Sequence, residues 1–258
     1  MSRLWPDALH AGLFPGHCWL AKKKGKRDLL ASFAAPASAA GVLTGLHECI
    51  IQSTDKRKLH GKLSITVSDS IATIVPLPWQ DGLNSEAELL GYAQLCFEKQ
   101  GHDVRANWVT RVEYPRYAKP GLAYALPRDW MESVQGELEG HGLRLETVLP
   151  ISAQVFCSGL GSSRHGLSII LLFESTQHCA IAFRDGALIA RDVEPFAQTV
   201  DATCRRLLAR VFANHNQSAT VPPAITWWSS MGVEFPKQAL EAYAPDLIPS
   251  FLSEKVWP

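Results

Sequence analysis

The residues 161–168, Gly-Ser-Ser-Arg-His-Gly-Leu-Ser, have the glycine spacing of a phosphate-binding P-loop. Such a loop needs a lysine that reaches the phosphates and a helix whose N-terminus faces them. Leu167 stands in place of that lysine, and the apolar residues after it predict a strand. Ser162 and Ser163 lie beside His165, but they lack the GxSxG turn that exposes a nucleophile. We therefore expect this segment to be a connecting loop and expect no catalytic residue in it.

The nine histidines and six cysteines lack the spacing of metal ligands, because the sequence contains neither an HExxH nor a CxxC motif. We expect His141 and His178 to be surface residues or hydrogen-bonded core residues, and we expect no metal site and no cofactor. Scattered cysteines are typical of a protein from a reducing compartment. The basic residues 22–27 form the main charge cluster of the sequence. A solvated hairpin tip is the favoured interpretation of this cluster over contact with an acidic partner or with anionic lipid headgroups.

The composition of the 258-residue chain is that of a globular protein, with 47% hydrophobic and 19% charged residues. Its formal net charge is zero, which argues against a nucleic-acid partner. The longest apolar run, residues 169–173, suits a buried strand and is too short to span a bilayer. The start of the chain lacks the apolar core of a signal peptide. We predict a cytoplasmic protein.

The first part of the chain predicts two hairpins separated by a helix. Residues 17–24 and 29–33 flank a polar turn and predict the first hairpin. An alanine-rich helix is expected over residues 34–51. Residues 62–67 alternate between apolar and polar types, and residues 71–75 resume the pattern after Asp69-Ser70, which predicts the second hairpin.

Two capping boxes mark helices in the next part of the chain. Ser85 with Glu88 and Asp129 with Glu132 each have the spacing of such a box. Strands are expected at residues 106–112, 121–126 and 143–149, followed by a short helix at 151–156.

The last part of the chain repeats this order of strand, hairpin and helix. A buried strand at residues 168–173 precedes a hairpin with an Asp185-Gly186 turn. A helix with apolar residues from Val200 to Val211 follows, then a strand at residues 224–228 and a helix near 236–243. Two halves of this kind indicate an α/β protein of two related lobes.

The order of these elements resembles that of the PilM family of type IV pilus assembly proteins and of the cytoplasmic domain of GspL from type II secretion. The resemblance lies in residues 62–75 leading into Leu77-Pro78, in the strand at 121–126, in Gly142-Leu143, and in the hairpin at Asp185-Gly186. It covers about residues 63–208. It implies an α/β, actin-like (ribonuclease H-like) two-lobed fold with an inserted α+β subdomain. Residues 1–76 with 150–165 would form the first lobe, 77–149 the inserted subdomain and 166–258 the second lobe, with a fourth subdomain reduced because the polar loop 214–220 is short.

The phosphate-binding loops of the actin-like ATPases are not evident in this sequence. Such proteins place an Asp-x-Gly segment at the first hairpin tip of each lobe, so that backbone amides approach the phosphates and the aspartate holds a hydrated metal ion. The first tip is expected at residues 21–25, where no aspartate precedes the glycine. The second is expected at 173–177, which has Glu174 but no glycine, and Ser-Ser-Met-Gly at 229–232 replaces the Gly-Gly turn on the adenosine side.

The resemblance therefore favours a non-enzymatic adaptor with a degenerate nucleotide site. It implies protein partners: the cytoplasmic tail of an inner-membrane assembly protein, and also a secretion or pilus ATPase. An actin-like ATP-binding protein with altered phosphate loops is the alternative, and a small-molecule enzyme outside this family is a third. A groove beside the inserted subdomain would bind the partner as an extended peptide. Trp79, Trp108 and Tyr124 are the candidate partner-binding residues, with a core role as the alternative for each.

Overall fold

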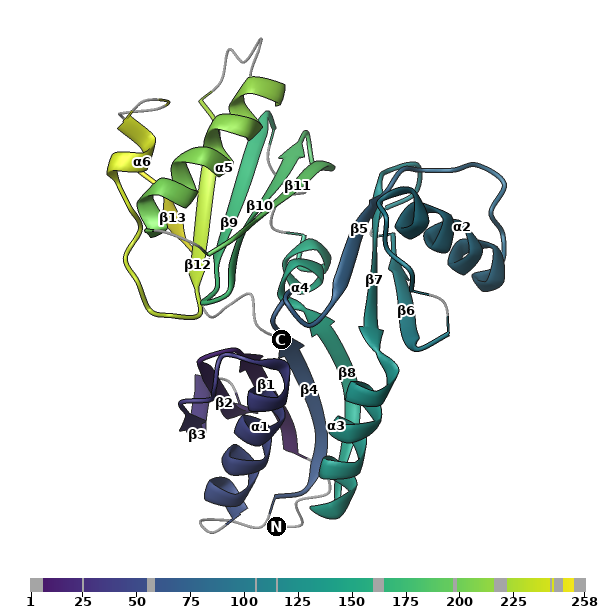
Figure 1. Ribbon diagram of the computed structural model, residues 1–258, viewed down its shortest axis with the longest axis vertical. Coiled ribbons are helices and arrows are strands. Elements are labelled where there is room, and N and C mark those ends of the chain that lie inside the picture. The colour runs from purple at the N-terminus through teal and green to yellow at the C-terminus, as the bar shows by residue number, and fades with distance from the viewer. Residues whose placement is uncertain are drawn as a thin grey trace.

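The computed structural model describes residues 7–24, 26–54, 59–104, 106–114, 116–159, 165–196, 199–215, 222–241, 243 and 248–252. Figure 1 shows two lobes, one above the other, each a sheet with helices packed on it, and a smaller unit to one side. Residues 161–164 of the P-loop-like segment and most of the polar loop 214–220 lie outside the described residues, as do the side chains of residues 23–27 in the basic turn.

The first lobe contains a five-stranded sheet in the order β3-β2-β1-β4-β8. Its strands are β1 (Asp7–Phe14), β2 (His17–Lys24), β3 (Lys26–Phe33), β4 (Gly61–Val67) and β8 (Leu143–Pro150). The first three strands form antiparallel hairpins, whereas β4 runs parallel to both β1 and β8. The parallel pairings need crossover connections, which helices supply.

Two helices pack on this sheet, α1 (Ala39–Thr54) on its β2 side and α3 (Arg128–Gly140) on β8. Gly45 is what allows α1 to lie so close to β2. A Cβ atom at that position would lie 2.5 Å from the Sγ atom of Cys18, well inside van der Waals contact. A third helix, α4 (Ile151–Cys157), follows β8 and lies between the two lobes (Figure 1).

The smaller unit is a three-stranded antiparallel sheet in the order β5-β7-β6 with one helix on it. It consists of β5 (Thr73–Leu77), α2 (Glu86–Lys99), β6 (Trp108–Glu113) and β7 (Gly121–Pro127). The predicted capping box begins α2: the Oγ atom of Ser85 accepts the Glu88 N–H at 3.2 Å, and the Glu88 carboxylate accepts the Ser85 N–H at 3.0 Å. A small apolar cluster that includes Val75, Phe97 and Ala123 fills the space between helix and sheet.

The second lobe repeats the mixed sheet in the order β11-β10-β9-β12-β13. Its elements are β9 (Leu167–Phe173), β10 (Gln177–Arg184), β11 (Ala187–Pro195), α5 (Val200–His215), β12 (Ala224–Ser229), α6 (Gln238–Glu241) and β13 (Ser250–Phe251). Asp185 (φ 49°) and Gly186 (φ 76°) form the predicted turn between β10 and β11, and both adopt the left-handed conformation that such turns require.

Every residue of β9 is buried because both faces of the strand are covered. Leu167, Ile169 and Leu171 pack with α5 and α6. Ile170 and Leu172 point the other way, into the core of the first lobe. Phe14 and Trp228 meet in this shared core with their ring centroids 5.0 Å apart. One hydrophobic core therefore spans both lobes, and a second core lies on the other face of β9, under α5 and α6.

The strand pairings correct several sequence-based expectations. The strand β1 was not predicted. Residues 62–67 and 71–75 do not form a hairpin, because β4 and β5 belong to different sheets. The inserted subdomain was expected to span residues 77–149. The strand pairing instead places β5, which begins at Thr73, in the small sheet, and β8, which begins at Leu143, in the sheet of the first lobe. The second capping box is wrong as well, since α3 begins after Pro127 without a side-chain cap.

No helix among the described residues has the length and apolar character needed to cross a membrane.

Candidate functional site

A long groove lies between the small sheet and the first lobe. Its volume is about 1080 Å³. The floor and walls come from one face of β6 and β7, from α3, from the length of β8 and from the end of α4; the lining includes Val109, Arg111, Tyr124, Gln135, Thr147 and Cys157. Because alternate residues of a strand point to the same side, Val109, Arg111 and Glu113 all face the groove while Trp108 and Val112 pack toward α2.

One edge strand, β8, lines this groove along its length, whereas β6 contributes one face to the lining. In the part of the chain that the structure describes, β8 is the last strand of the first sheet and β6 is the last strand of the small sheet. An edge strand presents backbone N–H and C=O groups that have no neighbouring strand on that side. The groove therefore combines a concave surface with backbone groups that can pair with an added strand.

Charged side chains of both signs line the groove. Arg111 and Glu113 project from β6, and Arg144 and Glu146 from β8. Burial raises the pKa of Glu113, against the opposing effect of Arg111. The carboxylate of Glu146 accepts bonds from Lys62 Nζ and Ser64 Oγ, each at 3.2 Å. Glu146 is also the residue at which the register between β4 and β8 shifts, so the edge strand is irregular at the middle of the groove.

The three predicted partner-binding residues do not lie together. Tyr124 lines the groove, where burial raises the pKa of its phenol. Trp108 packs against the apolar cluster under α2, on the other face of the small sheet. Trp79 is half-buried away from the groove lining, between Tyr114 and Tyr117, and its indole N–H donates to Asp81 at 2.7 Å.

The interlobe region holds the hairpin tips at which an actin-like ATPase would bind phosphate. The first tip is the β1–β2 turn at Pro15-Gly16, not the basic turn at residues 21–25, because the unpredicted β1 moves the first hairpin forward in the sequence. Gly16 has a φ of 89°. The second tip is the β9–β10 turn at residues 174–176, as expected. Ser175 Oγ donates to the Pro15 carbonyl oxygen at 2.5 Å, so the two tips are in direct contact.

A cleft of about 700 Å³ lies beside these tips. Its lining is rich in apolar and aromatic side chains, among them Trp19, Trp228 and Phe251, and also includes residues 229–232. No basic side chain is among the described residues that line it, apart from the imidazole of His17.

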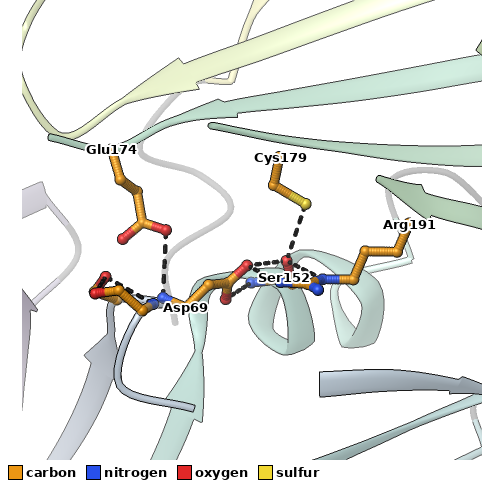
Figure 2. A network of polar contacts seen from close by, with 7 residues as sticks. Asp69, Ser152, Glu174, Cys179 and Arg191 are labelled. Carbon is orange, nitrogen blue, oxygen red and sulfur yellow. Dashed lines mark hydrogen bonds and ion pairs between the residues drawn. The ribbon is translucent and has the colours of Figure 1, made fainter. Parts of the chain in front are cut away.

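A buried polar network joins the lobes on the other side of the tips (Figure 2). Asp69, in the loop after β4, is fully buried, and its carboxylate accepts the Ser152 N–H of α4 at 2.9 Å and Arg191 Nη2 of β11 at 2.9 Å. Arg191 Nε also donates to Ser152 Oγ at 3.3 Å, and that hydroxyl lies 3.7 Å from the Sγ atom of Cys179. Two segments that are distant from Asp69 in the sequence, α4 and β11, therefore supply donors to one buried carboxylate.

Two further titratable groups are buried in this region. Burial and the nearby Asp69 carboxylate raise the pKa of Glu174 to about 8, and one oxygen of Glu174 accepts the Asp69 N–H at 3.3 Å. Burial lowers the pKa of His178 to about 4, against the opposing charge of Glu194. His178 lies between Phe173 and Phe196, with centroid distances of 5.1 and 4.9 Å. Both groups are held in their neutral forms at neutral pH.

Solved structures with the same arrangement of elements are numerous. A protein from Bacteroides thetaiotaomicron described as having an actin-like ATPase fold and unknown function matches with a TM-score of 0.64, at 13% identity over 97% of this chain and 91% of that one. This chain has the actin-like fold. The PilM–PilN type IV pilus biogenesis complex matches with a TM-score of 0.63, at 12% identity over 96% of this chain and 89% of that one.

The cytoplasmic domain of EpsL, an inner-membrane component of the type II secretion system of Vibrio cholerae, also has this fold. It matches with a TM-score of 0.53, at 14% identity over 86% of this chain and 82% of that one. No protein-family profile matches the sequence, and no curated protein shows significant sequence similarity to it. At such identities the likeness establishes the fold, and one fold serves many functions.

Sequence reasoning missed most of the residues that make up the groove and the interlobe network. The groove face of β6 could have been predicted, because Val109, Arg111 and Glu113 occupy alternate positions and so lie on one side of the strand. Asp69 and Ser70 were read as a turn that interrupts a hairpin. Nothing in the sequence indicates that Asp69 pairs with Arg191, because 122 positions separate them.

Proposed function

We propose that the chain is a non-enzymatic cytoplasmic adaptor of a type IV pilus or type II secretion-like assembly, which links an inner-membrane component to a cytoplasmic motor. The observation that carries this proposal is the groove that runs along the open edge strand β8. It is supported by the likeness to PilM in its complex with PilN and to the cytoplasmic domain of EpsL. The partner attached at the groove is the cytoplasmic tail of a membrane protein.

The tail binds as an extended peptide that adds a strand to β8. In this mode main-chain hydrogen bonds supply affinity, and alternate side chains enter pockets that supply selectivity. Tyr124 and Val109 offer apolar contacts along the groove. Arg111 and Arg144, set beside Glu113 and Glu146, favour a peptide that carries charges of both signs.

A bulky side chain in the groove tests this proposal. Thr147 of β8 is exposed and lines the groove, so Thr147→Trp obstructs it without entering the core. Peptides that tile the cytoplasmic tails of membrane proteins encoded beside this gene serve as probes in fluorescence anisotropy. We expect one peptide to bind the unmodified protein and to lose more than an order of magnitude in affinity for the variant.

The matched control places the same residue on an exposed position outside the groove. Glu132→Trp on α3 meets this condition and should leave peptide affinity unchanged. Equal affinity of Thr147→Trp and the unmodified protein for the bound peptide would reject the groove as the binding site. Failure of every tail peptide to bind would reject the adaptor function.

ATP binding with altered phosphate loops is the second candidate, and the cleft beside the hairpin tips is the observation in its favour. Three features oppose it: the direct contact between Ser175 and Pro15, the aromatic lining, and the absence of glycine from the second tip. We expect calorimetry with Mg-ATP and Mg-ADP to show no binding at millimolar nucleotide. Magnesium-dependent affinity in the micromolar range would instead favour the ATP-binding alternative.

A further inference from the structure

A cluster of metal-ligating side chains lies between α1 and α3, apart from the groove and from the interlobe network. His47 projects from α1, Glu137 projects from α3, and His141 caps the C-terminus of α3. Their ligand atoms, His47 Nδ1, Glu137 Oε1 and His141 Nε2, all lie within 4.8 Å of one another. This cluster was not predicted, because 90 positions separate His47 from Glu137 in the sequence.

Two of the three side chains, those of Glu137 and His141, project from the same side of α3 at its C-terminal end. Glu137 and His141 are four residues apart, so both lie on the same face of the helix end. That face is turned toward α1, since the Oε1 atom of Glu137 lies 2.8 Å from His47 Nδ1 and 3.1 Å from His141 Nε2. The two imidazole rings meet edge to face with their centroids 6.1 Å apart. Three potential ligands from two helices therefore converge on one point.

The spacing of these atoms is close to that of a four-coordinate metal site. Zinc lies about 2.0–2.2 Å from nitrogen and carboxylate ligands, which places tetrahedral ligand atoms about 3.3 Å apart. The Glu137 oxygen lies 2.8 and 3.1 Å from the two imidazole nitrogens, a few tenths of an ångström short of that value, and the three ligand atoms all lie within 4.8 Å of one another. The side chains are partly exposed, 45% for His47, 27% for Glu137 and 28% for His141, so an ion and a water ligand can enter from solvent.

We propose that His47, Glu137 and His141 bind a transition-metal dication of the zinc class and thereby join α1 to α3. Two imidazoles and one carboxylate suit zinc, cobalt and nickel better than magnesium or calcium, which prefer oxygen ligands. When the ion binds, the proton of each neutral imidazole moves from the nitrogen that faces the carboxylate to the other ring nitrogen, so that His47 Nδ1 and His141 Nε2 become free to coordinate the metal. A water molecule completes the coordination.

The position of the cluster gives the ion a structural role. His141 lies two residues before β8, and Gly142 between them lines the partner groove. A metal that fixes the end of α3 against α1 also fixes the start of the edge strand. The metal site itself does not depend on the proposed adaptor function, because its ligands lie outside the groove lining.

Zinc and cobalt titrations of the full chain, after treatment with a chelator, test the proposal. We expect one equivalent of Zn²⁺ to bind in calorimetry. At about 100 times the dissociation constant, zinc should raise the melting temperature by roughly 5–10 °C. Co²⁺ should give the visible absorption of a four-coordinate ion with nitrogen and oxygen ligands, without the charge-transfer band that a cysteine thiolate would add.

Variants test whether the bound zinc ion is held by these three residues. His47→Ala and Glu137→Gln should each weaken zinc binding by more than an order of magnitude and abolish the thermal shift. His102→Ala, an exposed histidine after α2, is the control and should change neither. Circular dichroism reports whether each variant folds. If Glu137→Gln does not fold, the zinc affinity of His47→Ala alone tests the assignment. The proposal is overturned if the unmodified chain binds no zinc, or if a folded variant retains the equivalent with unchanged affinity.

Discussion

At the scale of single residues, two buried carboxylates close to each other are stabilised in different ways. Asp69 pairs with Arg191 and accepts the Ser152 N–H. Glu174 is fully buried, and its Oε2 atom has no hydrogen-bond partner among the described residues. Since a buried charge without a partner is costly, Glu174 is held in its protonated form.

The raised pKa of Glu174 predicts a pH-dependent stability. Its ordinary pKa of 4.5 rises to about 8 in the folded protein, so the folded state binds the extra proton between these values. The contribution of Glu174 to stability is complete below pH 4.5 and is lost as the pH rises toward 8. Glutamine mimics the protonated acid. Glu174→Gln should therefore match the unmodified protein near pH 5 and exceed it above pH 8 by on the order of 2–4 kcal/mol.

Urea denaturation at several pH values measures this difference. Glu132→Gln, at an exposed position, is the control and should show no such pH-dependent gain. A constant difference between Glu174→Gln and the unmodified protein from pH 5 to pH 9 would show that Glu174 is ionised when folded.

Residues of the interlobe network were not predictable from the sequence for a physical reason. Each of Asp69, Ser152, Glu174 and Arg191 is an ordinary polar residue in a loop, in a helix or in a strand. Their significance arises only when the chain folds back over long distances. By contrast, the capping box of α2 is local, and its two residues identified the start of the helix correctly.

At the scale of elements, the sequence predicted most helices and strands but missed β1. That strand contains Gly12 and His10 among its apolar residues, so its alternation is weak. The omission had a consequence, because without β1 the basic turn was taken for the first phosphate hairpin. Similarly, β8 was assigned to the insert, since nothing local distinguishes a strand that pairs with β4 from one that pairs with β7.

The packing of α1 on β2 predicts the outcome of adding one methyl group. Alanine favours a helix interior over glycine by about 1 kcal/mol. A methyl group at Gly45, however, would lie 2.5 Å from Cys18 Sγ and 2.9 Å from Cys18 Cβ. Overpacking of this kind costs about 1–3 kcal/mol. Gly45→Ala should therefore lower the free energy of unfolding, by up to about 2 kcal/mol net.

Gly91 of α2 provides the matched control, because a Cβ atom there meets nothing within 4 Å. Gly91→Ala should raise the free energy of unfolding by up to about 1 kcal/mol through helix propensity alone. If both variants are stabilised equally, α1 does not lie as close to β2 as the structure shows.

At the scale of the whole molecule, the lobes share one hydrophobic core and one polar network. The core extends from Phe14 and Leu46 in the first lobe to Ile170, Leu172 and Trp228 in the second. The shared core predicts that both lobes unfold in a single cooperative transition.

The Asp69–Arg191 pair provides the sharpest test of how firmly the lobes are joined. Arg191→Met leaves the fully buried Asp69 without its cation, and breaking a buried pair in this way costs about 3–5 kcal/mol. The double variant Asp69→Leu with Arg191→Met removes both charges, so it should recover a large part of that loss. Urea denaturation gives the free energies of unfolding. Hydrogen exchange at α4, which contributes Ser152 to the network, should accelerate most in the single variant.

If Arg191→Met costs less than about 1 kcal/mol, solvent reaches Asp69 and the pair does not join the lobes. If the double variant is no more stable than the single one, the loss comes from the packing of the Arg191 side chain rather than from an unpaired charge.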